Sequence, residues 1–192
     1  MSDVGFYFTI GWQHIISFDA LDHQLFILAL TVLYTLKEWK KVLVLVTAFT
    51  IGHSITLALS TLNIVTVPSD LVEFFIPCTI FITAAANIIK PGSNHKFIQL
   101  NYLFAMFFGL VHGLGFANAL KFMLAKDQSL GWSLLFFNLG LEAGQIAVVV
   151  LLLLLAHIFL FYLKVNRRYW IISISAAVLL VSLKMAIDRF PS

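Results

Sequence analysis

The sequence predicts an all-α protein, a polytopic membrane helix bundle of six transmembrane helices preceded by a short N-terminal interfacial or re-entrant helix. The first observation is composition, because 61% of the 192 residues are hydrophobic and 11% are charged. Soluble domains carry roughly 25% charged residues. The second is a mean hydropathy of +0.99. The third is a regular alternation of apolar segments with short polar loops, so we expect one transmembrane domain over residues 1–192.

Each predicted span has nearly the length and composition that a bilayer requires, about 20 largely apolar residues. The six stretches are 20–36, 41–60, 71–89, 97–120, 133–161 and 169–186. Residues 6–18 are also apolar, but Asp19 and Asp22 follow them closely. A helix from residue 6 through the first span would exceed the thickness of a bilayer. Residues 6–18 are therefore expected to form the separate short helix.

The distribution of basic residues predicts the orientation of the bundle. Eight of them lie in alternate loops, namely Lys37, Lys40, Lys41, Lys90, Lys96, Lys164, Arg167 and Arg168. Four lie toward the other side, namely Lys121, Lys126, Lys184 and Arg189. Loops rich in Lys and Arg remain in the cytoplasm. We therefore expect a bacterial cytoplasmic (inner) membrane protein with both termini outside.

Polar residues inside the predicted spans suggest a metal site, because burying an ionisable group in a bilayer costs a few kcal/mol. The expected metal ligands are His14, Asp22, His23, His53, His112 and Glu142. The expected supporting polar residues are Asp19, Ser54, Asn138 and Gln145. Asp22 and His23 follow Asp19 by three and four residues, and Asn138, Glu142 and Gln145 are spaced by four and three, which places each set on one helix face. A rise of 1.5 Å per residue puts them at a common depth in the outer half of the membrane.

The charge balance of these residues favours a bound cation. Asp19, Asp22 and Glu142 have no Lys or Arg at the same expected depth, so protons, protonated histidines or a metal must neutralise them. Histidine and carboxylate ligands suit nickel, cobalt and zinc, and the lone Cys78 excludes a cysteine-rich site. The alternative is that the histidines only bind helices together, which is the expectation for the isolated His157. Glu142 can also be a protonated structural carboxyl.

Two glycine pairs flank the polar residues of the fourth and fifth spans. Gly109 and Gly113 surround His112, while Gly140 and Gly144 surround Glu142. Small residues four apart allow helices to approach closely. We therefore expect these two spans to pack together and to bring His112 and Glu142 within reach of one ion.

The sequence resembles the HupE/UreJ family, membrane proteins associated with hydrogenase and urease gene clusters. One family motif reads Phe-His-Gly-x-Ala/Val-His-Gly-x-Glu, and residues 107–115 match it at Gly109, His112 and Gly113. Phe108 replaces its first histidine and Gly115 replaces its glutamate. Another motif places a histidine five residues before Asp-His, whereas seven residues separate His14 from Asp22-His23. The stretches 48–57, 108–117 and 137–145 are similar to a divergent second branch of the family.

The resemblance implies a nickel or cobalt permease, and the residues favour the same leading hypothesis, a divalent transition-metal permease in which the ion is taken up from outside. The main alternative is a membrane-embedded metal-dependent hydrolase that uses the same His, Asp and Glu groups, with Ser54 assisting. The third hypothesis is a structural or assembly subunit that binds no metal. The expected partners are the lipid bilayer and the metal ion, with a homo-oligomer and metalloenzyme-maturation proteins left open. No phosphate-binding, dinucleotide or nucleic-acid motif occurs in the sequence.

Overall fold

The computed structural model describes residues 3–91, 95–123 and 130–191, and at 3, 19, 95–100, 118–119 and 121–123 it describes the backbone alone. This part of the chain is mainly helical and contains no strand. The α-helices are α1 (Asp3–Ile16), α2 (Leu21–Thr31), α3 (Trp39–Thr61), α4 (Ser69–Ile89), α5 (His95–Met123), α6 (Leu130–His157) and α7 (Arg167–Asp188). Short helices complete the fold: 3-10 turns η1 (Phe18–Ala20) and η2 (Leu36–Glu38), and the π-helical turn η3 (Ile158–Tyr162). The expectation of an all-α protein is confirmed.

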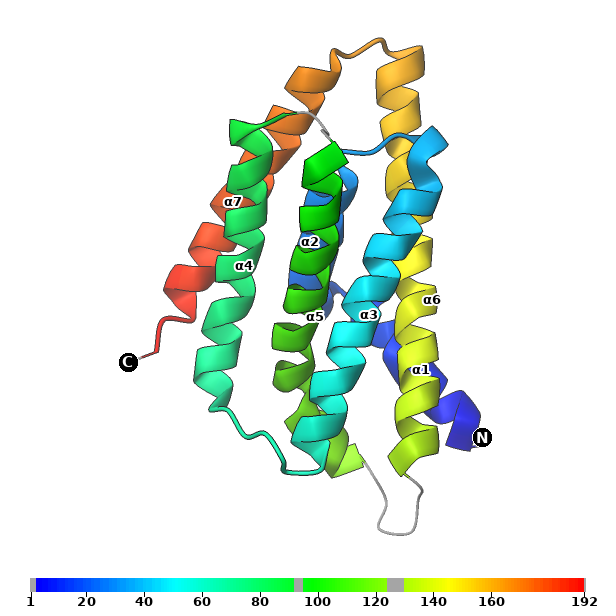
Figure 1. Cartoon of the computed structure of the whole chain (residues 1–192), viewed down its shortest axis with the longest axis vertical. Helices are drawn as coiled ribbons and strands as arrows, with labels where there is room; N and C mark the ends of the chain where they lie inside the picture. Colours follow the sequence, from blue (N-terminus) through cyan, green and yellow to red (C-terminus); the bar gives the residue numbers. More distant parts are fainter. Residues whose placement is uncertain (1–2, 92–94, 124–129, 192) are drawn as a thin grey trace.

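The long helices associate mainly in pairs. The most extensive contacts join α3 to α5, α1 to α6 and α4 to α7, while α2 packs against α4, α6 and α7. Figure 1 shows the long helices running roughly along one axis, with α1 and α2 behind the front layer. Aromatic rings fill much of the core, for example Phe26 stacked on Phe108 at 4.1 Å.

Four helical segments are long and apolar enough to cross a membrane, which makes this a multi-pass membrane protein. They are Leu36–Thr61, Ser69–Ile89, Leu130–Tyr162 and Arg167–Asp188. The described side chains of α5 add a shorter apolar stretch, Asn101–Ala117. The predicted number of six spans is not confirmed by the described residues.

The first predicted span differs most from the structure. Residues 20–36 were expected to form one helix, but α2 has 11 residues, about 16 Å, which is too short to cross a bilayer alone. The chain is extended at Ser17 and forms η1 before α2 begins. Gln24 donates its side-chain amide to the carbonyls of Ile15 (3.1 Å) and Ser17 (3.0 Å). The bond to Ile15 satisfies a carbonyl group that the end of α1 leaves without a helical partner, and the Ser17 carbonyl also accepts the backbone N–H of Ala20. The result is two short helices, α1 and α2, separated by a break at residues 17–20.

The glycines of α5 and α6 produce close helix contacts, but with partners other than those expected. A Cβ added to Gly109 would overlap the Phe49 carbonyl oxygen of α3, and one added to Gly140 would overlap the Phe8 carbonyl oxygen of α1. The glycines therefore do not join α5 to α6 as expected, and these two helices meet instead through the stacked rings of Phe116 and Phe137, 4.9 Å apart. Small residues permit a close approach of two helices, but they do not specify which helix approaches.

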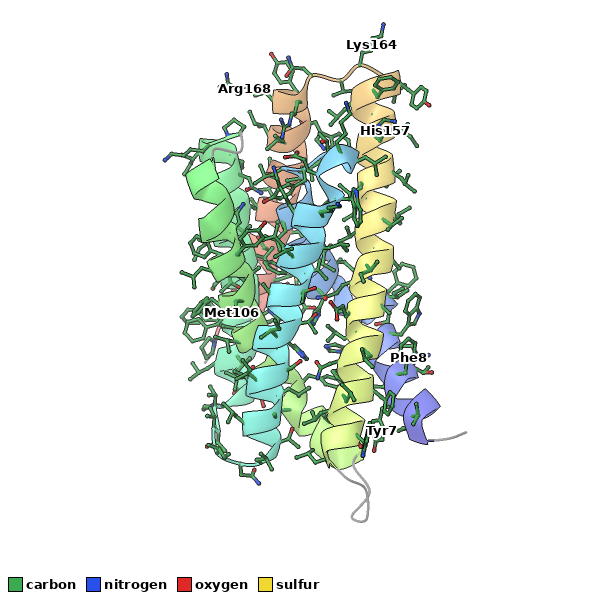
Figure 2. All side chains as sticks on the ribbon, turned by 45° about the vertical axis from the view of Figure 1, so that its right-hand side comes forward. Tyr7, Phe8, Met106, His157, Lys164 and Arg168 are labelled. Carbon is green, nitrogen blue, oxygen red and sulfur yellow. The ribbon has the colours of Figure 1, made fainter. Side chains whose placement is uncertain are left out.

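The basic connecting segments gather at one end of the molecule. Figure 2 shows Lys164 and Arg168 at that end with His157 close to it, while Tyr7 and Phe8 lie toward the opposite end. In Figure 1 the connection from α2 to α3 lies at the same end as the connection from α6 to α7. The turn between α3 and α4 lies at the opposite end, and both termini lie in that half of the molecule. This arrangement is compatible with the predicted orientation, which remains a prediction.

Candidate metal centre

Four histidines from four different helices converge inside the bundle. His14 lies in the last turn of α1, His23 in the first turn of α2, His53 in the middle of α3, and His112 in α5. The ring centroids of His14 and His23 are 4.6 Å apart, and those of His23 and His112 are 4.7 Å apart. His14 lies 6.2 Å from His53. Residues separated by almost a hundred positions therefore form one cluster, which we call the histidine cluster.

The ring nitrogens of the histidine cluster are oriented as metal ligands usually are. The Nδ1 atom of His23 lies 3.0 Å from the Asp22 carboxylate, and the Nδ1 atom of His112 lies 3.1 Å from the Phe108 carbonyl oxygen. Both partners are acceptors, so each Nδ1 atom carries the proton and each Nε2 atom keeps a free lone pair. Metal-binding histidines are commonly fixed by such a bond from the second nitrogen.

The remaining nitrogens of the cluster are buried without a hydrogen-bond partner among the described residues. These atoms are Nε2 of His14, His23 and His112, and both ring nitrogens of His53. An unsatisfied buried polar atom costs about 1–3 kcal/mol. Histidines that only joined helices would have used these nitrogens in hydrogen bonds. Their arrangement is more typical of a site that receives an ion or water.

Two groups of ligand atoms in this region are close enough to hold a metal ion. One group is His14, His23 and His53, and the other is Asp22, His23 and His112, with the ligand atoms of each group within 4.8 Å of one another. Ligand atoms around one transition-metal ion lie roughly 3 Å apart, so small rotamer changes would complete the coordination. His23 belongs to both groups and is therefore the centre of the arrangement.

Aromatic rings enclose the histidine cluster. The ring of Phe116 lies 4.1 Å from that of His14, and Phe137 packs against both His14 (5.8 Å) and His53 (6.1 Å). On the other side, Phe49 lies 5.4 Å from His112. An apolar shell of this kind restricts water and fixes the orientation of the ligands.

Asp22 has a basic partner that sequence reasoning did not find. The Nη1 atom of Arg189, the residue that ends α7, lies 3.6 Å from Oδ2 of Asp22. The expectation that no Lys or Arg reaches the depth of Asp22 is therefore wrong. The long arginine side chain reaches from a helix end into the site, as basic side chains near helix ends commonly do. The sequence held one indication of this contact, because Arg189 and Asp22 were both predicted to lie toward the outer side of the membrane.

A cavity of about 330 Å³ leads to the histidine cluster. Its lining includes His14, Asp22, His23, Glu73, His112 and Arg189. Glu73 lies near the start of α4, and it was not among the ligands expected from the sequence. Three of the four imidazoles and two carboxylates therefore line one cavity.

Glu142 lies in a neighbouring polar layer and not in either ligand group. Its carboxylate accepts a hydrogen bond from Thr47 (2.8 Å), and Gln145 accepts one from Thr50 (3.0 Å), so both residues of α6 bond to α3. Because Gly140 and Gly144 face α1, the side of α6 that carries Glu142 faces elsewhere. His112 and Glu142 were expected to share one ion, and the structure does not bring them together.

The other expected supporting residues differ in position. Asn138 donates to the Leu134 carbonyl oxygen within its own helix (2.8 Å), and its side-chain oxygen is buried without a hydrogen-bond partner among the described residues. Ser54 donates to the Thr50 carbonyl oxygen (2.7 Å) and so bonds within α3. The side chain of Asp19 lies outside the described part of the chain.

A comparison with known families identifies the protein's relatives. A family model described as HupE / UreJ protein matches residues 1–189. The chain belongs to the HupE/UreJ family. Searches of curated proteins and of solved structures gave no match. The resemblance inferred from the sequence is therefore confirmed over almost the whole chain of this HupE/UreJ protein.

Both departures from the HupE/UreJ motif lie at the site. Phe108 stands where the motif has its first histidine, and its backbone carbonyl accepts the Nδ1 proton of His112. Gly115 stands where the motif has glutamate, and it lines the cavity. Apart from His112, the histidines and carboxylates that line this cavity come from α1, α2 and α4, outside that motif.

Proposed function

We propose that this HupE/UreJ protein is a permease for a divalent transition-metal ion such as nickel, cobalt or zinc. The ion is held during transport by His14, His23, His53 and His112, with Asp22 orienting His23. The observation that carries the proposal is the set of buried imidazole nitrogens without hydrogen-bond partners. Neutral imidazoles favour transition metals, whereas magnesium and calcium prefer oxygen ligands.

The proposed topology has six crossings with both termini outside the cytoplasmic membrane. In this arrangement α1 and α2 together make a broken first crossing, and α5 joins the four long apolar segments as a further crossing. Broken helices are found at the ion sites of other transporters. The break between α1 and α2 lies between His14 and His23, which supports the same interpretation.

The layer that contains Glu142 supports an inward path for the ion. Thr47 precedes His53 by six residues of α3, about 9 Å toward the basic end of the molecule. The Thr47–Glu142 and Thr50–Gln145 pairs therefore place oxygen ligands one to two helical turns beyond the histidine cluster. We propose that Glu142 receives the ion after it leaves the imidazoles, rather than sharing it with them.

Uptake into liposomes separates this function from its alternatives. Proteoliposomes that contain a trapped metal-sensitive dye should accumulate nickel or cobalt, and His112→Ala should abolish the flux. Glu142→Gln should slow uptake by roughly tenfold while leaving equilibrium binding almost unchanged. The reason is that it alters only the site proposed to receive the ion after it leaves the imidazoles. Metal binding without flux would favour the hydrolase, and a wild-type protein without bound metal would favour the structural subunit.

A further inference from the structure

We propose that Arg189 determines the metal specificity of the site by acting as a built-in cation that occupies Asp22. This inference rests on the proposed metal-binding function and adds a role for a residue outside the histidine cluster. In this role, the guanidinium group weakens the binding of magnesium and calcium to the carboxylates of the cavity. An ion that binds through imidazole nitrogen is then preferred.

Both oxygens of Asp22 are already engaged. Oδ1 accepts bonds from the backbone N–H of His23 (2.8 Å) and from its ring Nδ1 (3.0 Å), and Oδ2 faces the guanidinium of Arg189 at 3.6 Å. The exposed fraction of the side chain is 15% for Asp22 and 32% for Arg189. A pair that is mostly shielded from solvent is screened less than one on the surface. Asp22 is therefore occupied by a positive charge before any metal arrives.

The position of Arg189 is fixed by its neighbours. Its backbone N–H bonds to the Met185 carbonyl oxygen (3.1 Å), which continues the last turn of α7. The next residue, Phe190, places its ring edge-to-face with Phe74 of α4 at 5.4 Å. The end of α7 is thereby attached to α4, and the guanidinium is held at the cavity rather than free in solvent.

The carboxylates of the cavity would otherwise suit hard cations. Asp22 and Glu73 both line it, and oxygen ligands from carboxylates are what calcium and magnesium require. With Arg189 in place, the charge of Asp22 is neutralised, which leaves Glu73 as the other carboxylate of the cavity. Calcium loses the attraction that would drive its dehydration, whereas nickel or cobalt binds through imidazole nitrogens, for which Asp22 serves only to orient His23. Arg189 is therefore expected to alter selectivity more than nickel affinity.

Competition binding tests the role of Arg189. Purified protein in detergent would be equilibrated with nickel, and calcium or magnesium would be titrated against it. In R189Q, calcium should compete at least about tenfold more effectively than in the wild type, with nickel affinity changed by less than threefold. R189K should fall between the two, because lysine retains the charge without the planar geometry of arginine. Adding Glu73→Gln to R189Q should reverse much of the gain in calcium competition.

The matched control is K184Q, which removes one positive charge from an exposed position of the same helix. It should compete with calcium as the wild type does. Equal calcium competition in wild type and R189Q, or equal changes in R189Q and K184Q, would overturn the proposal. If R189Q fails to fold, R189K is compared with the wild type instead. Wild-type selectivity in R189K would then count against the role of Arg189. Absence of nickel binding in the wild type would refute the proposed metal site instead.

Discussion

At the scale of single residues, the important property is which nitrogen of each histidine is free. His112 uses Nδ1 to donate to its own helix and leaves Nε2 without a hydrogen-bond partner among the described residues, with its ring 4.7 Å from that of His23. His157 is different, because its ring stacks on Phe161 at 5.2 Å near the basic end of α6. Both residues are histidines, but only His112 belongs to the histidine cluster, so we expect only His112 to bind metal.

Replacement of single histidines tests this distinction. His53→Ala and His112→Ala should each weaken nickel or cobalt binding by roughly a hundredfold or more, since even partners behind metal ligands contribute about 10–100-fold. His157→Ala should leave the affinity unchanged. Isothermal titration of the purified variants provides the measurement. Equal losses in all three variants would show that the histidines act through packing.

Sequence reasoning assigned five residues that the structure brings into one region, namely His14, Asp22, His23, His53 and His112. Their helical spacing and their cost in a bilayer were sufficient for that. It could not identify Arg189 as the partner of Asp22, because the contact depends on how α7 packs against α2. It also joined Glu142 to His112, although the face of α6 that carries Glu142 bonds to α3.

At the scale of helices, glycine determines how closely α3 approaches α5. Gly52 of α3 and Gly109 of α5 each lie against a backbone carbonyl of the opposite helix, so the contact is reciprocal. The same contact sets the spacing of His53 and His112, which lie one and three residues from these glycines. Helix packing and ligand geometry are therefore coupled at this interface.

A bulky residue at this interface should damage both stability and binding. Gly109→Val would force its side chain into the Phe49 carbonyl oxygen, and overpacking of this kind costs about 1–3 kcal/mol or more. We expect a lower melting temperature in detergent and weaker metal binding. Gly131→Val is the control, because a Cβ at Gly131 meets nothing within 4 Å. A Gly109→Val protein as stable as this control would contradict the close contact.

The hydrophobic pattern predicted most helices but not their continuity. Spans near 41–60 and 71–89 correspond to α3 and α4, because long apolar runs between charged loops leave few alternatives. The break between α1 and α2 was expected, because Asp19 and Asp22 follow the apolar residues 6–18. The end of α2 at Thr31 was not expected, since residues 20–36 are as apolar as the other spans. Gln24 bonds the start of α2 to the end of α1, and this contact is formed only in the folded chain.

At the scale of the whole molecule, the orientation predicted from basic residues remains to be tested. With Cys78 replaced by serine, a cysteine introduced at Asn166 should react with a membrane-impermeant thiol reagent only from the cytoplasmic side. A cysteine at Ser69 should react only from outside, because the turn before α4 lies at the end opposite Asn166. Intact cells and inverted vesicles supply the two sides. The reverse labelling pattern would place the cavity on the cytoplasmic side.

The central claim is that imidazoles of the histidine cluster bind a transition-metal ion. X-ray absorption spectroscopy at the nickel or cobalt edge of the loaded protein tests it most directly, because imidazole ligands give a characteristic multiple-scattering pattern. The account predicts about one ion per chain with several imidazole ligands, and loss of that pattern when His53 and His112 are both alanine. An ion coordinated only by oxygen, or a spectrum that the double replacement leaves unchanged, would contradict it.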